Sequence, residues 1–193
     1  MPMFKAGIID YTWANKPSVA PLGQIICVTD VGENGSLWRG NGTKWVRLNP
    51  IKVFSLSAPV VLTGSTSVVT LATITIPAGL LGANGKLKIY PLWSTTNNAN
   101  VKTLRVVFGG GSALTTMTSQ SVPNNSGLLI IRNINSESAQ KTSSGLVAGI
   151  GSSSGSIAST TIDTTAATTL VISGQLAVGT DTLTLEDLFV EVV

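Results

Sequence analysis

The chain of 193 residues repeats one local pattern from end to end: short runs rich in Val, Ile, Leu and Thr, separated by Gly, Pro and Asn. Such runs are typical of β-strands, and the separating residues are typical of turns. No stretch of a dozen residues shows the 3.6-residue spacing of apolar side chains that an amphipathic helix requires. The pattern therefore predicts an all-β protein.

Eight strand-like segments follow residue 50, which is a suitable number of strands for a β-sandwich. Apolar and polar residues alternate in residues 73–76 and 86–90, so one face of these strands is expected to pack inward and the other to meet solvent. Immunoglobulin-like sandwiches share this spacing of strands and turns, which leaves the strand order open. The expected strands are residues 51–56, 67–76, 86–93, 102–108, 128–133, 156–163, 168–175 and 182–192.

The composition changes near residue 50, because three of the four tryptophans precede it. Residues 23–30, 36–39 and 44–48 read as three short strands joined by two Asn-Gly turns, which predicts a small β-meander. Trp38 and Trp45 flank the second turn and are expected to meet across the strands. The first 22 residues contain three prolines and no apolar period, which predicts an extended arm.

We therefore expect two domains. Residues 1–49 form an N-terminal arm and small β-meander, and residues 50–193 form the sandwich. Two stretches rich in Gly, Ser and Thr, residues 109–121 and 143–159, are read either as disordered linkers or as bent strands, and both readings stay open. The run Gly109-Gly110-Gly111 is expected to be a hairpin loop, since no Lys or helix follows it as in a phosphate-binding loop.

The composition excludes several kinds of catalytic site. The chain contains no His and one Cys, which excludes imidazole-based triads, His-ligated zinc and an internal disulfide. Glu186, Asp187 and Glu191 are the candidate acids for a hydrolytic pair, but Glu186 and Asp187 are adjacent and would face opposite sides of a strand. We expect no catalytic residue, no metal site and no cofactor, with Cys27 as a small buried apolar side chain.

Charge is scarce, with 12 Lys and Arg and 9 Asp and Glu giving a net charge of +3. The basic residues of the strands are scattered singly and are expected to lie across from acids such as Asp181 and Glu191 on neighbouring strands. We therefore expect no nucleic-acid partner. No segment has the length of a signal peptide core or a membrane span, which predicts a soluble protein made in the cytoplasm without membrane insertion.

The chain has more apolar residues than a monomer with so few charged residues is expected to bury. Hydrophobic residues make up 43% of the chain and charged residues only 11%. A sandwich has two outer faces and sheet edges, which soluble proteins normally protect with charge or proline. The composition therefore predicts that part of the outer surface is buried against other copies of the same chain.

Trp93 and the two asparagines Asn97 and Asn98 form the most distinctive loop signal in the larger domain. One reading makes them contacts for a glycan or receptor, because indoles and amides recognise sugars. The structural reading is an indole that closes one end of the sandwich, with asparagines satisfying turn backbone, and we favour it because a lone Trp beside a turn needs no further assumption.

Three stretches of the chain resemble virion structural proteins of tailed bacteriophages. They are residues 29–45, with their Gly and Trp unit, residues 76–107 and residues 172–192. The resemblance implies a jelly-roll knob similar to the trimeric, tumour-necrosis-factor-like heads of phage fibres, with an N-terminal arm that fixes it to the particle. It implies no enzymatic activity. The chain has no coiled-coil or triple-helical shaft, which favours a short spike or a head decoration protein over a long tail fibre.

We therefore expect a non-enzymatic virion protein, made in the host cytoplasm, that forms a homotrimer on a capsid or tail protein and presents its knob for host attachment. The residues expected to attach it to the particle are Phe4, Tyr11, Trp13, Trp38 and Trp45, since aromatic anchors dominate interfaces. The alternatives are a carbohydrate-binding module that uses the Trp93 loop and, behind it, a glycan hydrolase.

Overall fold

The computed structural model describes residues 8–30, 35–111, 113–121, 123–143 and 157–193. All regular elements in this part of the chain are β-strands, and it contains no helix. The prediction of an all-β protein is therefore confirmed. The chain divides into two compact units, residues 1–53 and residues 54–193, here called the N-terminal unit and the sandwich unit.

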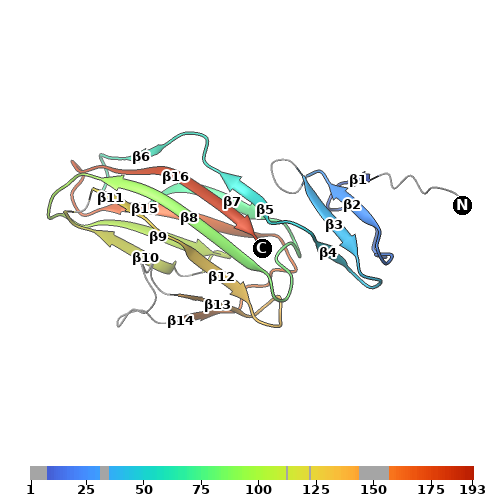
Figure 1. The fold of residues 1–193 in the computed structure, drawn as a ribbon. Helices are drawn as coiled ribbons and strands as arrows, with labels where there is room; N and C mark the ends of the chain where they lie inside the picture. Colours follow the sequence, from blue (N-terminus) through green and yellow to red (C-terminus); the bar gives the residue numbers. More distant parts are fainter. Residues whose placement is uncertain (1–7, 31–34, 112, 122, 144–156) are drawn as a thin grey trace, which may run out of the picture. The chain divides into compact units, whose positions relative to one another are not determined.

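The N-terminal unit is built on one four-stranded sheet in the order β1-β2-β3-β4 (Figure 1). β1 runs parallel to β2, whereas the other two pairs are antiparallel. The Asn-Gly turns place Gly35 and Gly42 at positive φ values of 73° and 95°, as tight hairpins require. The strands are β1 (Ile9–Tyr11), β2 (Ile25–Val28), β3 (Ser36–Gly40) and β4 (Trp45–Arg47).

The expected three-stranded meander thus has a fourth strand, which comes from the predicted arm. β1 (Ile9–Tyr11) joins the sheet edge through its parallel register with β2, in which Tyr11 lies opposite Val28. Thr29 N donates to Tyr11 O at 2.8 Å and extends this pairing. A parallel partner 17 residues away in sequence has no local turn signal, so sequence patterning could not identify β1 as a strand.

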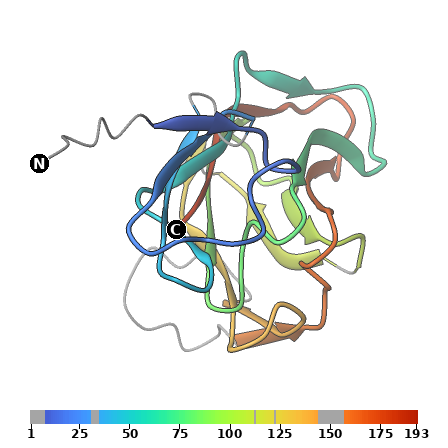
Figure 2. The same cartoon turned by 90° about the vertical axis from the view of Figure 1, so that its right-hand side faces the viewer.

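The sandwich unit consists of two sheets, seen from a second side in Figure 2. The smaller sheet has the order β10-β9-β15-β7, and the larger has the order β14-β13-β12-β8-β16-β5, with β6 also pairing β16 and β11 pairing β8. β5 (Ile51–Ser55) crosses the boundary between the units. The other strands are β6 (Val60–Leu62), β7 (Val69–Ile76), β8 (Lys86–Thr95), β9 (Lys102–Phe108), β10 (Ala113–Ser119), β11 (Asn124–Ser126), β12 (Leu129–Asn133), β13 (Gln140–Ser143), β14 (Ile157–Thr160), β15 (Thr168–Leu176) and β16 (Leu183–Val192).

Strands β7, β8 and β9 alternate between the two sheets. β7 and β9 lie in the smaller sheet, where β15 pairs with both, and β8 lies in the larger sheet, where it pairs with β16. A β-sandwich is therefore confirmed. The jelly-roll type stays a prediction.

The core lies between the sheets and is almost entirely aliphatic. Gly174 of β15 shows how closely the sheets approach, because a Cβ atom there would lie 3.1 Å from Leu62 Cδ2 and 3.4 Å from Leu183 Cδ2, both in the opposite sheet. The inward-facing positions of the central strands are 0–1% exposed, namely Leu87, Ile89, Leu104, Val106, Phe108, Leu170, Ile172, Leu188 and Val190. This burial explains the alternating pattern that the sequence shows.

The two Gly-, Ser- and Thr-rich stretches have different outcomes. Residues 113–119 form β10 with a register shift after Ala113, so the bent-strand reading is confirmed for this stretch. Gly109 and Gly110 have φ values of 68° and 72° and form the predicted hairpin loop between β9 and β10. In the second stretch, residues 144–156 lie outside the described residues, and residues 157–160 form β14.

Candidate functional site

The predicted attachment aromatics lie mainly inside the N-terminal unit. Trp38 is 6% exposed and its ring centroid lies 5.1 Å from that of Trp13. Trp38 Nε1 donates to Ser36 Oγ at 2.8 Å, which satisfies the buried indole. The expected contact between Trp38 and Trp45 is replaced by this contact with Trp13, because Trp38 stands opposite Arg47 and Trp45 opposite Gly40.

Residues 12–22 cover this closed face of the sheet. Trp45 Nε1 donates to Pro17 O at 2.7 Å, and Lys16 Nζ lies 4.4 Å from the Trp13 ring centroid. Gly40 allows the segment to approach, since a Cβ atom there would lie 2.0 Å from Pro21 O. The Trp38 ring is therefore part of the core of this small unit, and its role in attachment stays a prediction. Phe4 lies outside the described residues.

The opposite, open face of this sheet carries apolar side chains in solvent. Arg39 stands opposite Ile25 on one side and Val46 on the other, so the three side chains share one face. Leu37, two residues before Arg39, lies on the same face. Leu48 N donates to Leu37 O, which places Leu48 beside it. All five are exposed: Ile25, Leu37, Arg39, Val46 and Leu48, here called the open face.

The open face was missed by sequence reasoning, although a signal was present. In β2 both alternating sets of residues are apolar, so neither side of this strand is the polar side that solvent would favour. Charge is also unevenly divided between the units: residues 1–53 contain six Lys and Arg against three Asp and Glu, whereas residues 54–193 contain six of each. The N-terminal unit therefore has a net charge of +3, and the sandwich unit has a net charge of zero.

The predicted glycan contacts have different environments in the structure. Trp93 lies in β8 and is 1% exposed, so its indole does not present a face to a soluble sugar. This burial agrees with the structural reading of Trp93, and the glycan contact stays a prediction. Asn97 is exposed, while Asn98 is half-buried and engaged with Asp181 and Lys102.

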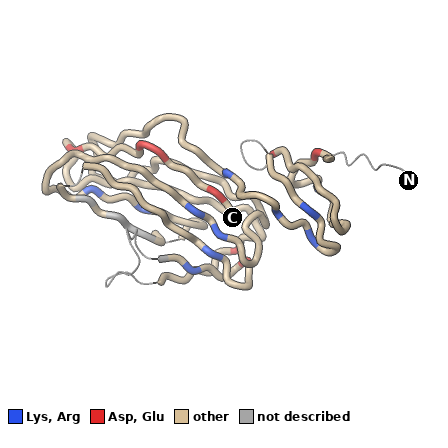
Figure 3. The backbone as a smooth tube through the Cα atoms, viewed as in Figure 1, with Lys and Arg blue, Asp and Glu red and all other residues tan. Residues whose placement is uncertain are grey.

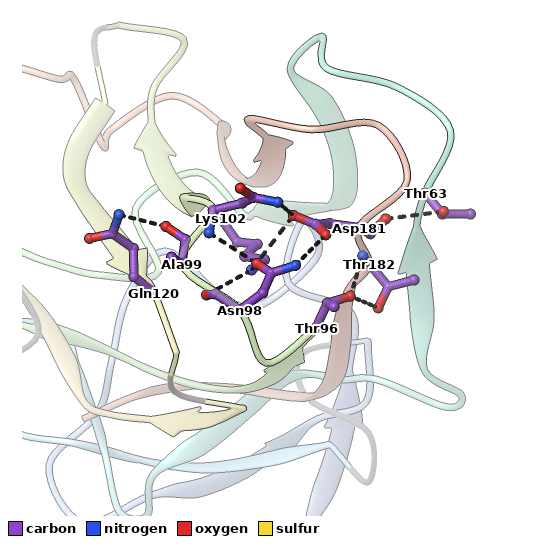
Figure 4. A network of polar contacts seen from close by, with 9 residues as sticks. Thr63, Thr96, Asn98, Ala99, Lys102, Gln120, Asp181 and Thr182 are labelled. Carbon is purple, nitrogen blue, oxygen red and sulfur yellow. Dashed lines mark hydrogen bonds and ion pairs between the residues drawn. The ribbon is translucent and has the colours of Figure 1, made fainter.

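A buried ion pair organises this end of the sandwich (Figure 4). Lys102 Nζ lies 3.6 Å from Asp181 Oδ2, and it also donates to Asn98 Oδ1 and, at 3.4 Å, to Asn98 O. Asn98 Nδ2 and Asn100 Nδ2 donate to the two Asp181 oxygens at 2.7 and 3.0 Å. The β8–β9 loop is therefore tied to the turn between β15 and β16.

These contacts lower the pKa of the Asp181 carboxyl below its ordinary value. The hydrogen bond from Asn98 contributes most, and the amide of Asn100 and the ammonium of Lys102 act in the same direction, whereas desolvation opposes them. Thr96, directly after β8, and Thr182, directly before β16, add a contact of 2.9 Å between their hydroxyl oxygens. The charged groups of Lys102 and Asp181 both have polar partners, as a buried ion pair needs in order to stabilise the fold.

A second, neutral polar cluster lies around Asn133, the last residue of β12. Asn133 Nδ2 donates to Thr164 Oγ1 at 2.9 Å and to Gly82 O at 2.6 Å. Gln140 Nε2 donates to Asn133 Oδ1 at 2.8 Å, and its Oε1 accepts from Ile162 N at 2.9 Å. These amides satisfy loop backbone that the sheets leave unpaired.

The acids weighed for hydrolysis do not converge. The register shift between Leu185 and Asp187 marks a β-bulge, at which Glu186 accepts a hydrogen bond from Ser94 Oγ. Glu191 Oε1 lies 3.0 Å from Lys88 Nζ on the neighbouring strand, which confirms the expected cross-strand pairing of these charges. Within the described ranges, no three Cys, Asp or Glu side chains gather as a metal site would require.

In the part of the chain that the structure describes, no helix is long and apolar enough to cross a membrane. Cys27 is half-buried and has a free thiol.

No protein-family model matches the chain, and no curated protein matches its sequence. Among the solved structures that match, two show weak similarity to this chain. One is the insecticidal delta-endotoxin Cry8Ea1 from Bacillus thuringiensis, with a TM-score of 0.32 and 17% identity over 70% of this chain and 19% of that chain. The other is infectious bursal disease virus, Gx strain, with a TM-score of 0.30 and 10% identity over 78% of this chain and 44% of that chain. The chain therefore spans less than half the length of either.

Proposed function

We propose that the chain is a non-enzymatic structural protein of a tailed-bacteriophage particle. The N-terminal unit attaches to a capsid or tail protein, and the sandwich unit forms a trimeric knob that faces outward for host attachment. The proposal rests on the resemblance of residues 29–45, 76–107 and 172–192 to phage virion proteins. It is supported chiefly by one structural observation, the open face of the N-terminal unit.

The open face has the composition of a binding surface. Leu37, Val46 and Leu48 are 37%, 41% and 47% exposed, whereas the closed face of the same sheet is covered by residues 12–22. Exposed apolar clusters rimmed by polar groups mark interaction sites. Arg39 stands between Ile25 and Val46 and has no ion-pair partner within the described residues, so an acidic group on the partner would complete the contact.

Incorporation into particles tests the attachment. Mass spectrometry of purified particles produced by the genome that encodes this chain should detect the wild-type protein. The double variant Leu37→Ser and Val46→Ser should be strongly depleted from these particles. The matched control is Val61→Ser and Val68→Ser, which changes two exposed sandwich residues and should incorporate normally. Absence of the wild-type chain from the particles overturns the proposal.

The trimer is tested separately by native mass spectrometry. Copies of this charge-poor chain are expected to cover each other's sheet surfaces, since closed symmetric association is the usual solution. A chain mass of 19.9 kDa predicts a species of about 60 kDa. A monodisperse monomer at high concentration would contradict this part of the proposal.

A further inference from the structure

Three basic residues lie side by side on the outer face of the larger sheet. Arg132 of β12 stands directly opposite Lys86 of β8 on one side and Lys141 of β13 on the other. All three are exposed, while Leu87 and Ile131, next to them in sequence, are buried. The three side chains therefore share the solvent face and form a basic row. Figure 3 shows Lys and Arg segments on these neighbouring strands.

The basic row is unusual because its charges are not compensated. Like charges directly opposite on a sheet destabilise the pairing. The other three bases of the sandwich unit have partners: Lys88 lies 3.0 Å from Glu191, Lys102 lies 3.6 Å from Asp181, and Arg105 donates to Gln175 at 2.6 Å. Within the described residues, no acid pairs with the basic row.

The acids of the adjoining segments, including Glu137 in the β12–β13 loop, form no ion pair with the row within the described residues. Asp163 Oδ1 accepts hydrogen bonds from Thr165 N and Thr165 Oγ1, at 2.9 and 2.6 Å. Glu191 belongs to Lys88, one step further along the strands. An uncompensated row of this kind is completed by an anionic ligand from outside the unit.

We infer that the basic row binds an anionic polysaccharide, a sugar polymer that carries carboxylate or phosphate groups. Neighbouring strands are about 4.8 Å apart, so the outer charges of the row lie roughly 10 Å apart along a line. A linear polymer with repeated anionic groups can follow such a line. This inference rests on the proposed function, in which the sandwich unit faces a host surface.

The surroundings of the row favour a sugar polymer over other polyanions. Ser159 is exposed and lies opposite Lys141, and Asn135 and Ser138 are exposed in the adjoining loop. Hydroxyl and amide groups can exchange hydrogen bonds with sugar hydroxyls. Nucleic-acid binding requires a wider basic surface and aromatic residues for stacking, but the sandwich unit has equal numbers of bases and acids and the row has no aromatic member.

Binding of the full-length protein to immobilised polymers tests the inference. The probes are polygalacturonate, which carries carboxylates, a glycerol-phosphate teichoic acid, neutral dextran and single-stranded DNA. We expect binding to at least one anionic polysaccharide, no binding to dextran, and affinity that falls steeply with added salt. The relative affinities for the first two probes identify the anionic group. No binding to either, or tighter binding to DNA, overturns the inference.

Two variants that each lose two positive charges distinguish binding at the basic row from nonspecific electrostatic attraction to the whole protein. Arg132→Gln with Lys141→Gln should weaken binding by about tenfold or more, since each base near an anionic surface contributes roughly 1 kcal/mol. Lys44→Gln with Lys52→Gln removes two bases that lie outside the basic row and the open face, and it should change affinity less than twofold. Equal losses in both overturn the site. The row variant should still enter particles, so its result is independent of the attachment test.

Discussion

Lys102 Nζ lies 3.6 Å from Asp181 Oδ2, and the two side chains are 0% and 5% exposed. Lys102 begins β9 in the smaller sheet, and Asp181 precedes β16 in the larger sheet. The ion pair therefore joins the two layers at their loop end. Its partners Asn98 and Asn100 extend the connection to the β8–β9 loop.

The pair predicts unequal effects of single and double substitutions. Lys102→Met leaves the Asp181 carboxylate buried without its cation, which destabilises more than removing both charges. We expect the melting temperature of Lys102→Met to fall well below that of the double variant Lys102→Met and Asp181→Asn. Lys88→Met, at the more exposed pair with Glu191, serves as control and should shift the melting temperature less. Equal melting temperatures for the single and double variants would contradict the prediction.

The lowered pKa of Asp181 predicts a loss of stability in acid. A carboxyl with a folded pKa below its unfolded pKa stabilises the fold above the unfolded value, about 3.9, and this contribution disappears as pH falls through the folded pKa. The free energy of unfolding, measured in urea from pH 5 to pH 2, should therefore fall less steeply in Asp181→Asn than in the wild type.

Asp163 contributes to the same acid transition. Hydrogen bonds from the Thr165 hydroxyl and backbone lower the pKa of Asp163, so part of the slope should remain in Asp181→Asn. Adding Asp163→Asn should flatten the curve further. Parallel curves for the wild type and Asp181→Asn would show that the carboxyl titrates alike in the folded and unfolded chains.

The two buried tryptophans are expected to respond differently to Phe. Trp38→Phe removes the donor to Ser36 Oγ, and a buried hydroxyl left without its partner costs about 1–3 kcal/mol. Trp93 Nε1 is buried without a hydrogen-bond partner, so Trp93→Phe removes an unsatisfied donor and should cost less. Urea unfolding followed at the transition of each unit measures both values. Anionic polysaccharide binding should be unchanged in Trp93→Phe.

Two adjacent glycines give a matched test of the β9–β10 hairpin. Gly109 and Gly110 both have positive φ, but a Cβ atom at Gly109 would lie 2.5 Å from Ile162 Cγ2, whereas none of the surrounding atoms lies within 4 Å of one at Gly110. Gly110→Ala should cost about 1 kcal/mol for the strained backbone alone. Gly109→Ala should cost roughly 2 kcal/mol or more, because Ile162 must also move. Thermal unfolding that ranks them in the opposite order would contradict this account.

Local features of the fold were readable from the sequence because their causes are local. Alternation of side chains over residues 86–90 identified the strand that the structure shows as β8 (Lys86–Thr95), since successive residues of a strand face opposite sides. The Asn34-Gly35 turn was also predicted, and Gly35 has the positive φ that it requires. β13 (Gln140–Ser143) was missed because its polar residues carry no apolar alternation.

Aromatic roles were harder to predict than aromatic positions. Trp38 was expected against Trp45 on the neighbouring strand, but its ring packs on Trp13 from a segment without regular periodicity. Trp93 was placed correctly in a strand, yet its burial depends on the opposing sheet. The identity of a residue shows what it can contact, and only the packing selects the partner.

The sequence by itself determined the all-β class, most strand positions and the tight glycine turns, because backbone propensity and side-chain period act over a few residues. The tertiary structure alone decided which strands are neighbours. Arg132 became the centre of a basic row only through its register with Lys86 and Lys141, and Lys102 met Asp181 only when distant loops came together. Pairing between strands far apart in sequence depends on the whole core, and no local pattern encodes it.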